Sequence, residues 1–399
     1  MAAGGRRVIS AAVLGFFAVL AGFGACSSES GLGPIHPGTG GSGQGGSSGG
    51  DLLPTDDGGP PPLDASGLCG NQLHTLTFDA PNVYFVIDAS GSMDAVVSGS
   101  TRFAVVRKAA IQLVRDLGPL INVGAALFPH GATADNGCAT GAEVMPITPG
   151  DAYTNGSDGP TTKKFKNVTD VLPAGGTPTA ASLAALLPGI QSAKGKTLVL
   201  LVTDGGPNCN PLASCDGAHC EPNIEGCSVA DASCCAAGGN CCASNQPWGP
   251  ASCIDDVATE AQIGLYKQAG LPVYVIGIPG SEAYADVLED MAFAAGTQQI
   301  ANPYYYAVKD LDNLQSVLAD IAGLAVSCTF TLDDPPMDGG NTNVYLDGVI
   351  LPSGGSDGWK WADDTLTEIE LLGLSCERLK GGQIKTVQIV SGCPTEPSK

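Results

Sequence analysis

Oxygen-bearing side chains occupy alternate positions directly after an apolar segment that ends at residue 87. Residues 83–87 form an uninterrupted apolar run, typical of a buried strand, and Asp88, Ser90 and Ser92 follow it. Carboxylate and hydroxyl oxygens are ligands that Mg²⁺ accepts in octahedral geometry. Asp, Ser and Gly also make ordinary turns after strands. This spacing therefore indicates a divalent-cation site only if the rest of the chain supplies further ligands.

Two further oxygen donors stand next to other predicted elements. Asp204 comes shortly after residues 197–202, a continuous apolar segment that predicts a strand buried on both faces of a sheet. Thr177 follows two glycines, which allow close approach of the backbone, and stands at the expected start of a helix. Ligands of open α/β sheets bind beyond the carboxyl ends of the strands. We therefore expect both residues to meet the Asp88 segment at that edge.

Five oxygen-bearing residues in this order resemble the metal-ion-dependent adhesion site of the von Willebrand factor A-type (VWA) domain family: Asp88, Ser90, Ser92, Thr177 and Asp204. The resemblance extends over roughly residues 82–325. It implies that the three hydroxyls bind Mg²⁺, or another divalent cation such as Mn²⁺ or Ca²⁺, directly. Asp88 and Asp204 would hold coordinated waters, or one of them would bind the metal in another state. An acidic side chain of a protein or peptide partner would then fill the open position, because Mg²⁺ prefers hard oxygen ligands.

A second interpretation gives the metal a purely structural role. Acids elsewhere in the chain could complete its coordination, and three stand in the segment after Asp204: Asp216, Glu221 and Asp231. Under the first interpretation the chain is a membrane-tethered adhesion module that binds its partner through the metal. Under the second it is a scaffold subunit of a cell-envelope assembly. An enzyme is not predicted, because none of the four histidines lies in a recognisable catalytic motif: His36, His74, His130 and His219.

The elements that position these residues alternate between strands and helices. Besides the segment before Asp88, short apolar segments predict strands at residues 121–128, 197–202, 273–278 and 304–308, with an edge strand at 163–171. Apolar spacing of three to four residues, or Ala/Leu-rich composition, predicts helices at 101–117, 177–190, 254–269, 282–295 and 311–324. The alternation predicts an α/β fold with a doubly wound, mostly parallel sheet, and residues 69–325 are expected to form this VWA domain.

The segment before this domain is predicted to be a targeting signal followed by a tether. Arginines precede an apolar stretch that is too short to span a membrane, so residues 1–25 are read as a signal peptide. Its end resembles a bacterial lipobox, which implies lipidation of Cys26; cleavage nearby would instead leave Cys26 as one more thiol. Residues 26–68 are rich in Gly, Ser and Pro and are predicted to form a flexible linker.

Two other regions break the strand–helix alternation. Residues 207–253 form an insertion with nine cysteines, whose spacing favours disulfides over the paired knuckles of a zinc site. Residues 326–399 have short β-type segments and are expected to form a small β-rich unit. Within that unit, Asp347 and Gly348 predict a two-residue hairpin turn, and Trp359 and Trp361 are expected to share one buried face of a strand.

Composition limits the compartment and the class of partner. The chain of 399 residues has a formal net charge of −22, which argues against nucleic-acid binding, since that rests on Lys and Arg neutralising phosphates. Fifteen cysteines favour an oxidising compartment. We therefore expect an extracytoplasmic protein of a bacterial cell envelope, lipid-anchored to the outer membrane or otherwise secreted.

Overall fold

The computed structural model describes residues 68–70, 72–97, 99–133, 136–226, 235, 239–246 and 248–398. The predicted signal peptide, Cys26 and all but the last residue of the predicted linker lie outside these residues. No helix in the described ranges is long and apolar enough to cross a membrane.

The central element of the fold is a six-stranded, mostly parallel sheet with strand order β10-β9-β8-β3-β6-β7. Its strands are β3 (Asn82–Asp88), β6 (Asn122–Phe128), β7 (Ala142–Pro149), β8 (Thr197–Thr203), β9 (Val273–Gly277) and β10 (Tyr306–Ala307). β3 pairs in parallel with β6 on one side and with β8 on the other, and only β7 in this sheet is antiparallel. The predicted fold class is confirmed.

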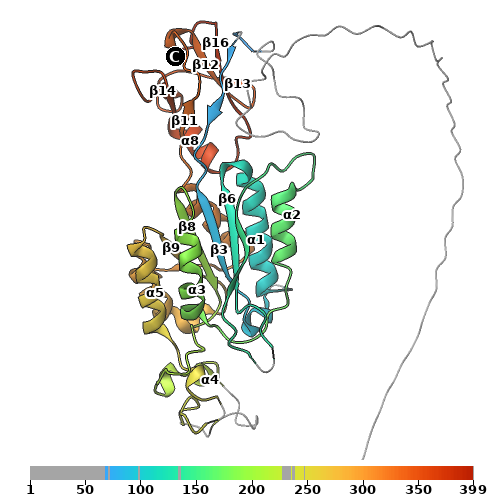
Figure 1. Cartoon of the computed structure of the whole chain (residues 1–399), viewed down its shortest axis with the longest axis vertical. Helices are drawn as coiled ribbons and strands as arrows, with labels where there is room; N and C mark the ends of the chain where they lie inside the picture. The colour runs from blue at the N-terminus through green and yellow to red at the C-terminus, as the bar shows by residue number, and fades with distance from the viewer. Residues whose placement is uncertain are drawn as a thin grey trace, which may run out of the picture. The chain divides into compact units, whose positions relative to one another are not determined.

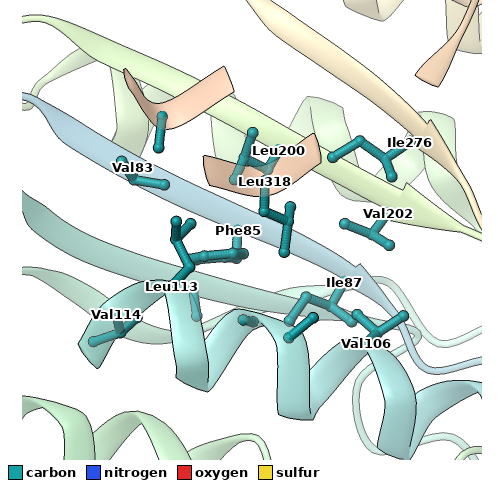
Figure 2. Close-up of a cluster of buried hydrophobic side chains, with 14 of the residues drawn as sticks. Val83, Phe85, Ile87, Val106, Leu113, Val114, Leu200, Val202, Ile276 and Leu318 are labelled. Atoms are coloured by element: carbon teal, nitrogen blue, oxygen red, sulfur yellow. The ribbon is translucent and has the colours of Figure 1, made fainter. Parts of the chain in front are cut away.

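Helices cover both faces of this sheet (Figure 1). Alternate residues of β3 enter two separate cores: Val83, Phe85 and Ile87 face one, whereas Tyr84 and Val86 face the other. The first core is closed by α1 (Arg102–Leu117), α2 (Pro160–Val168) and α7 (Leu311–Gly323), and Figure 2 shows part of this packing. The second is closed by α3 (Thr179–Gln191), α5 (Asp256–Gln268) and α6 (Ala285–Ala295). Burial on both faces explains the uninterrupted apolar composition of β3 and β8.

One predicted strand is wrong. Residues 160–168 form helix α2 instead of part of an edge strand at 163–171. Pro160 stands in its first turn, where its missing N–H costs no hydrogen bond. Phe165 is fully buried and packs edge-on against Phe85, with ring centroids 5.3 Å apart. The edge of the sheet is taken by β7, which the sequence did not indicate.

The C-terminal region forms two antiparallel four-stranded sheets around a core of its own. The sheet orders are β1-β16-β12-β13 and β14-β15-β11-β2. The elements are β11 (Thr329–Leu332), β12 (Thr342–Leu346), β13 (Val349–Leu351), β14 (Trp359–Trp361), β15 (Glu368–Leu371), α8 (Gly373–Lys380) and β16 (Val387–Ser391). The predicted hairpin between β12 and β13 is confirmed, since Asp347 and Gly348 both have positive φ, as a type I′ turn requires. Trp359 is fully buried in this core, and the partly buried Trp361 packs against it.

The N-terminal strands of the described chain complete these C-terminal sheets. β1 (Gln72–Leu73) pairs with β16, and β2 (Leu76–Thr77) pairs with β11. A disulfide joins Cys69 to Cys393 across 324 residues of sequence. Residues 69–77, which the predicted VWA range includes, therefore pack as part of the β-rich unit. The other domain boundaries stay predictions.

The cysteine-rich insertion is held by disulfides. Its described cysteines pair as Cys215–Cys253, Cys220–Cys242 and Cys235–Cys241, and Cys209 is bonded to Cys138 outside the insertion. A sixth disulfide, Cys328–Cys376, lies in the C-terminal unit. Cys227 and Cys234 lie outside the described residues. The only α-helix described in the insertion is α4 (Glu221–Ile224), and the short strands β4 (Val96–Val97) and β5 (Ser100–Thr101) form a separate hairpin before α1.

Candidate metal site at the carboxyl edge of the sheet

Asp88 is the last residue of β3, and its carboxylate is fully buried. One oxygen, Oδ1, accepts a hydrogen bond from the backbone N–H of Ser90 at 2.8 Å. The other, Oδ2, accepts one from the hydroxyl of Thr203, the last residue of β8, at 2.6 Å. Because β3 and β8 are neighbouring parallel strands, their ends bring these groups together, and the contacts fix the orientation of the carboxylate.

Three more of the predicted residues meet beside Asp88. The Oγ atoms of Ser90 and Ser92 lie 3.0 Å apart. Ser92 Oγ also donates a hydrogen bond to Asp204 Oδ1 at 2.8 Å. Ser92 belongs to a short 3-10 helix (Gly91–Asp94), which turns the chain sharply after the strand and points both hydroxyls to one side. Two carboxylates and two hydroxyls from two strand ends thus converge.

The loop that carries Thr177 lies directly against the Ser90 turn. The N–H of Gly91 donates to the carbonyl of Gly175 at 2.8 Å. Gly175 has φ +89°, and a Cβ on it would stand 2.3 Å from the carbonyl oxygen of Gly137, so this close approach requires glycine. Thr177 itself is buried, and its N–H donates to Asn208 Oδ1 at 2.7 Å. The structure thus places the loops that carry all five predicted residues at one edge of the sheet.

Arg102 is a residue of this site that sequence reasoning missed. Its Nη1 atom donates to Asp204 Oδ2 at 2.6 Å and to the backbone oxygen of Ser92 at 3.3 Å. The Arg102 side chain is 20% exposed and that of Asp204 is fully buried. Gly280 lies against the guanidinium: a Cβ added to Gly280 would be only 2.2 Å from Arg102 Nη2. A sequence signal existed: Arg102 is the first basic residue after the Asp88 segment.

The electrostatics of the site favour binding of a cation. Burial raises the pKa of Asp88, and the negative charge of Asp204 raises it further. Arg102 supplies one positive charge for two buried carboxylates. Mg²⁺ holds oxygen ligands at about 2.1 Å, so adjacent ligands of an octahedron are roughly 3 Å apart. The Ser90–Ser92 distance matches this value, and the donor set therefore fits a small divalent cation.

The cysteine-rich insertion begins directly beside the site. Asn208 accepts from the N–H of Thr177 through its amide oxygen and donates to Glu221 through its amide nitrogen. Burial, followed by the charge of Glu225, raises the pKa of Glu221 to about 7. Of the other two acids that the sequence offered as extra ligands, Asp216 is exposed and pairs with a neighbouring histidine. Asp231 lies outside the described residues.

Several solved structures are similar to this chain at low sequence identity. The pilus adhesin SpaC of Lactobacillus rhamnosus GG aligns with a TM-score of 0.45 and 15% identity, over 80% of this chain and 40% of that chain. The vWF domain of the type V pili tip protein Mfa5 of Porphyromonas gingivalis aligns with a TM-score of 0.39 and 12% identity, over 61% of this chain and 94% of that chain.

A third similar structure is proximal thread matrix protein 1 of the mussel byssus, solved with a zinc-occupied MIDAS motif. It aligns with a TM-score of 0.35 and 14% identity, over 61% of this chain and 45% of that chain. The present chain thus spans less than half the length of this protein and of SpaC. No model of a known protein family matches the sequence, and no curated protein matches it.

Proposed function

We propose that this protein is an extracytoplasmic binding module that recognises an acidic side chain of a protein or peptide through a bound Mg²⁺ ion. The observation that carries the proposal is the convergence of two serine hydroxyls and two buried carboxylates at neighbouring strand ends. Mn²⁺ or Ca²⁺ could take the same place. The bound ion would supply a positively charged acceptor for a carboxylate oxygen of the partner.

The residues of the chain divide this work among them. Ser90, Ser92 and Thr177 would bind the ion through neutral hydroxyl oxygens, which leave most of its charge available to a partner. Asp88 and Asp204 would accept hydrogen bonds from the hydroxyls and from metal-bound waters and so orient them. Ser92 already donates its proton to Asp204, which leaves a lone pair of Ser92 Oγ free for a cation.

Isothermal titration calorimetry with MgCl₂ tests the site. Asp88→Asn removes the buried charge while keeping the shape, and is expected to weaken Mg²⁺ binding by about 10- to 100-fold, the usual effect of losing a group that supports the ligands. Asp94→Asn is the matched control, since Asp94 is an exposed acid on the same turn. Absence of Mg²⁺ binding by the unmodified chain would refute the proposal.

A pull-down from envelope extracts with and without EDTA separates the two interpretations of the metal. A partner that is lost in EDTA supports the adhesion module. A bound metal without any EDTA-sensitive partner supports the scaffold with a structural metal.

The compartment and the tether rest on other observations than the metal site. Six disulfides in the described residues indicate an oxidising environment. We propose that Cys26 carries a lipid that anchors the chain in the cell envelope. Radioactive palmitate is expected to label the unmodified chain but not Cys26→Ser, and an unlabelled wild type would reject the anchor.

A further inference from the structure

A cavity of about 480 Å³ opens beside the proposed metal site. One wall is the glycine-rich loop at Gly175 and Gly176, and the other is the cysteine-rich insertion, with Glu221, Glu225 and Trp248. The Cys138–Cys209 disulfide ties the insertion to Gly137 and Cys138, which also line the cavity, and the carbonyl of Gly137 accepts a hydrogen bond from the N–H of Gly176. Asn208 lines the cavity and holds the N–H of Thr177, so the cavity and the metal site share a boundary. A ligand bound at one is therefore within reach of the other.

The insertion that forms the second wall carries a net negative charge. Residues 207–253 contain four acids and no Lys or Arg. Among the described residues, the side chains that hydrogen-bond to the cavity's two glutamates are neutral: the amide of Asn208 donates to Glu221, and the hydroxyl of Tyr284 donates to Glu225. No ion pair found in the described part of the chain involves either glutamate. The two carboxylates thus lack a cationic partner from the described residues.

The remaining lining fits the stem of a long side chain. Glycines, Pro222, Ala251 and a disulfide supply apolar surface, and Trp248 is 44% exposed beside them. An aromatic face attracts a cation electrostatically, and a Lys or Arg stem buries well along apolar surface. The volume lies within the range of pockets that bind small groups specifically.

We propose that this cavity binds the Lys or Arg side chain of the same ligand whose acidic side chain occupies the metal site. The proposal rests on the proposed function and makes it narrower: the ligand is a segment that presents an acidic and a basic side chain close together. A basic side chain of the ligand pairs with Glu221 and Glu225, whereas an acidic side chain in the cavity is repelled. The cavity therefore selects ligands that have a basic residue near the acidic residue at the metal site.

A metal-free titration tests the cavity independently of the metal site. The probe is Nα-acetyl-lysine amide, added to the full chain with its disulfides formed, in EDTA and low salt. Trp248 fluorescence is the readout, with Trp248→Phe as the blank for the other tryptophans. A saturable change is expected for this probe and not for Nα-acetyl-norleucine amide, which has the same four-carbon stem without the terminal ammonium group. Equal responses to both probes, or none to either, overturn the proposal.

Charge variants then show which residues are responsible. The double variant Glu221→Gln/Glu225→Gln keeps both hydrogen-bond acceptors. It is expected to weaken binding of the lysine probe at least about tenfold, because a charge-assisted contact is lost. Asp216→Asn is the matched control: it removes one charge from the same insertion outside the cavity, and Asn caps the following turn as well as Asp does. Equal weakening by the control and by the double variant refutes a role for the cavity.

Peptides distinguish failure of this inference from failure of the proposed function. Octapeptides of Gly and Ser carry one Asp, or one Asp and one Lys separated by one to four residues, and are measured with Mg²⁺. Tighter binding of an Asp–Lys peptide, lost in the double glutamine variant, supports the cavity. Equal Mg²⁺-dependent binding of the Asp and Asp–Lys peptides overturns the cavity inference but leaves the metal site intact. Mg²⁺-independent binding of all peptides counts against the proposed function instead.

Discussion

Removal of the positive charge of Arg102 is expected to make the stability of this protein depend on metal. In the structure, Arg102 supplies the cation for Asp204, whose side chain is fully buried. Arg102→Met keeps the length of the apolar stem and deletes the guanidinium. Asp204 and Asp88 then repel each other without a neighbouring cation, unless a divalent ion enters the site.

The magnitude follows from the burial of the pair. Breaking a buried ion pair by removing one partner costs about 3–5 kcal/mol. The low end, about 3 kcal/mol, applies here because Arg102 is 20% exposed. If Mg²⁺ replaces the guanidinium completely, the lost free energy of about 3 kcal/mol is recovered on metal binding. By linkage, Arg102→Met then binds Mg²⁺ up to about 100-fold more tightly than wild type. A ligand at 100 times its Kd stabilises a protein by about 2.7 kcal/mol, so saturating Mg²⁺ restores most of the loss.

Urea unfolding in EDTA and in saturating MgCl₂ measures both effects. Arg107→Met is the matched control: Arg107 stands on the same helix, and its ion pair is with the exposed Asp170. Arg107 also donates hydrogen bonds to the carbonyl of Lys166 and the hydroxyl of Thr169, so the control is expected to lose about 1–3 kcal/mol, equally in both buffers. The reasoning fails if Arg102→Met is equally destabilised with and without Mg²⁺, or if it binds Mg²⁺ more weakly than wild type.

Three further perturbations probe the surroundings of the site. Gly175→Ala places a Cβ 2.3 Å from a backbone oxygen at φ +89°, so a loss of at least about 1 kcal/mol and weaker Mg²⁺ binding in calorimetry are expected; Gly189→Ala, with open space around it, is the neutral control. Joint replacement of Cys138 and Cys209 by serine opens a link across 71 residues and is expected to cost about 4 kcal/mol in urea unfolding; an unchanged midpoint would contradict this. Because the folded-state pKa of Glu221 is raised to about 7, its contribution to stability is complete below the unfolded pKa and is lost as pH rises towards 7. The melting temperature of Glu221→Gln minus that of wild type is therefore expected to increase as the pH rises from about 5 to about 8. A difference that stays constant over that range would refute the assignment.

Local sequence was sufficient where one segment carries the whole signal. β3 and β8 are uninterrupted apolar runs because both of their faces are buried, and no other segment is needed to recognise this. The hairpin at Asp347 and Gly348 is local for a similar reason: two residues with positive φ set the turn. Asp88, Ser90 and Ser92 lie on a single turn, so their convergence follows from their spacing.

Helix α2 shows where a local pattern fails. The three lysines around Phe165 allow a strand or a helix equally well, and the choice depends on which face Phe165 can bury. Its packing against Phe85 of β3 decides for the helix, and that contact joins segments 80 residues apart. Propensity is a weak guide when tertiary packing supplies most of the stability of a helix.

The sequence by itself determined the strand ends, the oxygen donors that follow them and the acidity of the insertion. Tertiary structure alone decided that Arg102 neutralises Asp204, that β1 and β2 complete the C-terminal sheets, and that Glu221 and Glu225 share a cavity with the glycine-rich loop. The physical reason is the same in each case. Apolar periodicity and turn chemistry are properties of one segment, whereas ion pairs, strand pairing and cavity walls depend on groups brought together from distant positions by the packing of the whole chain.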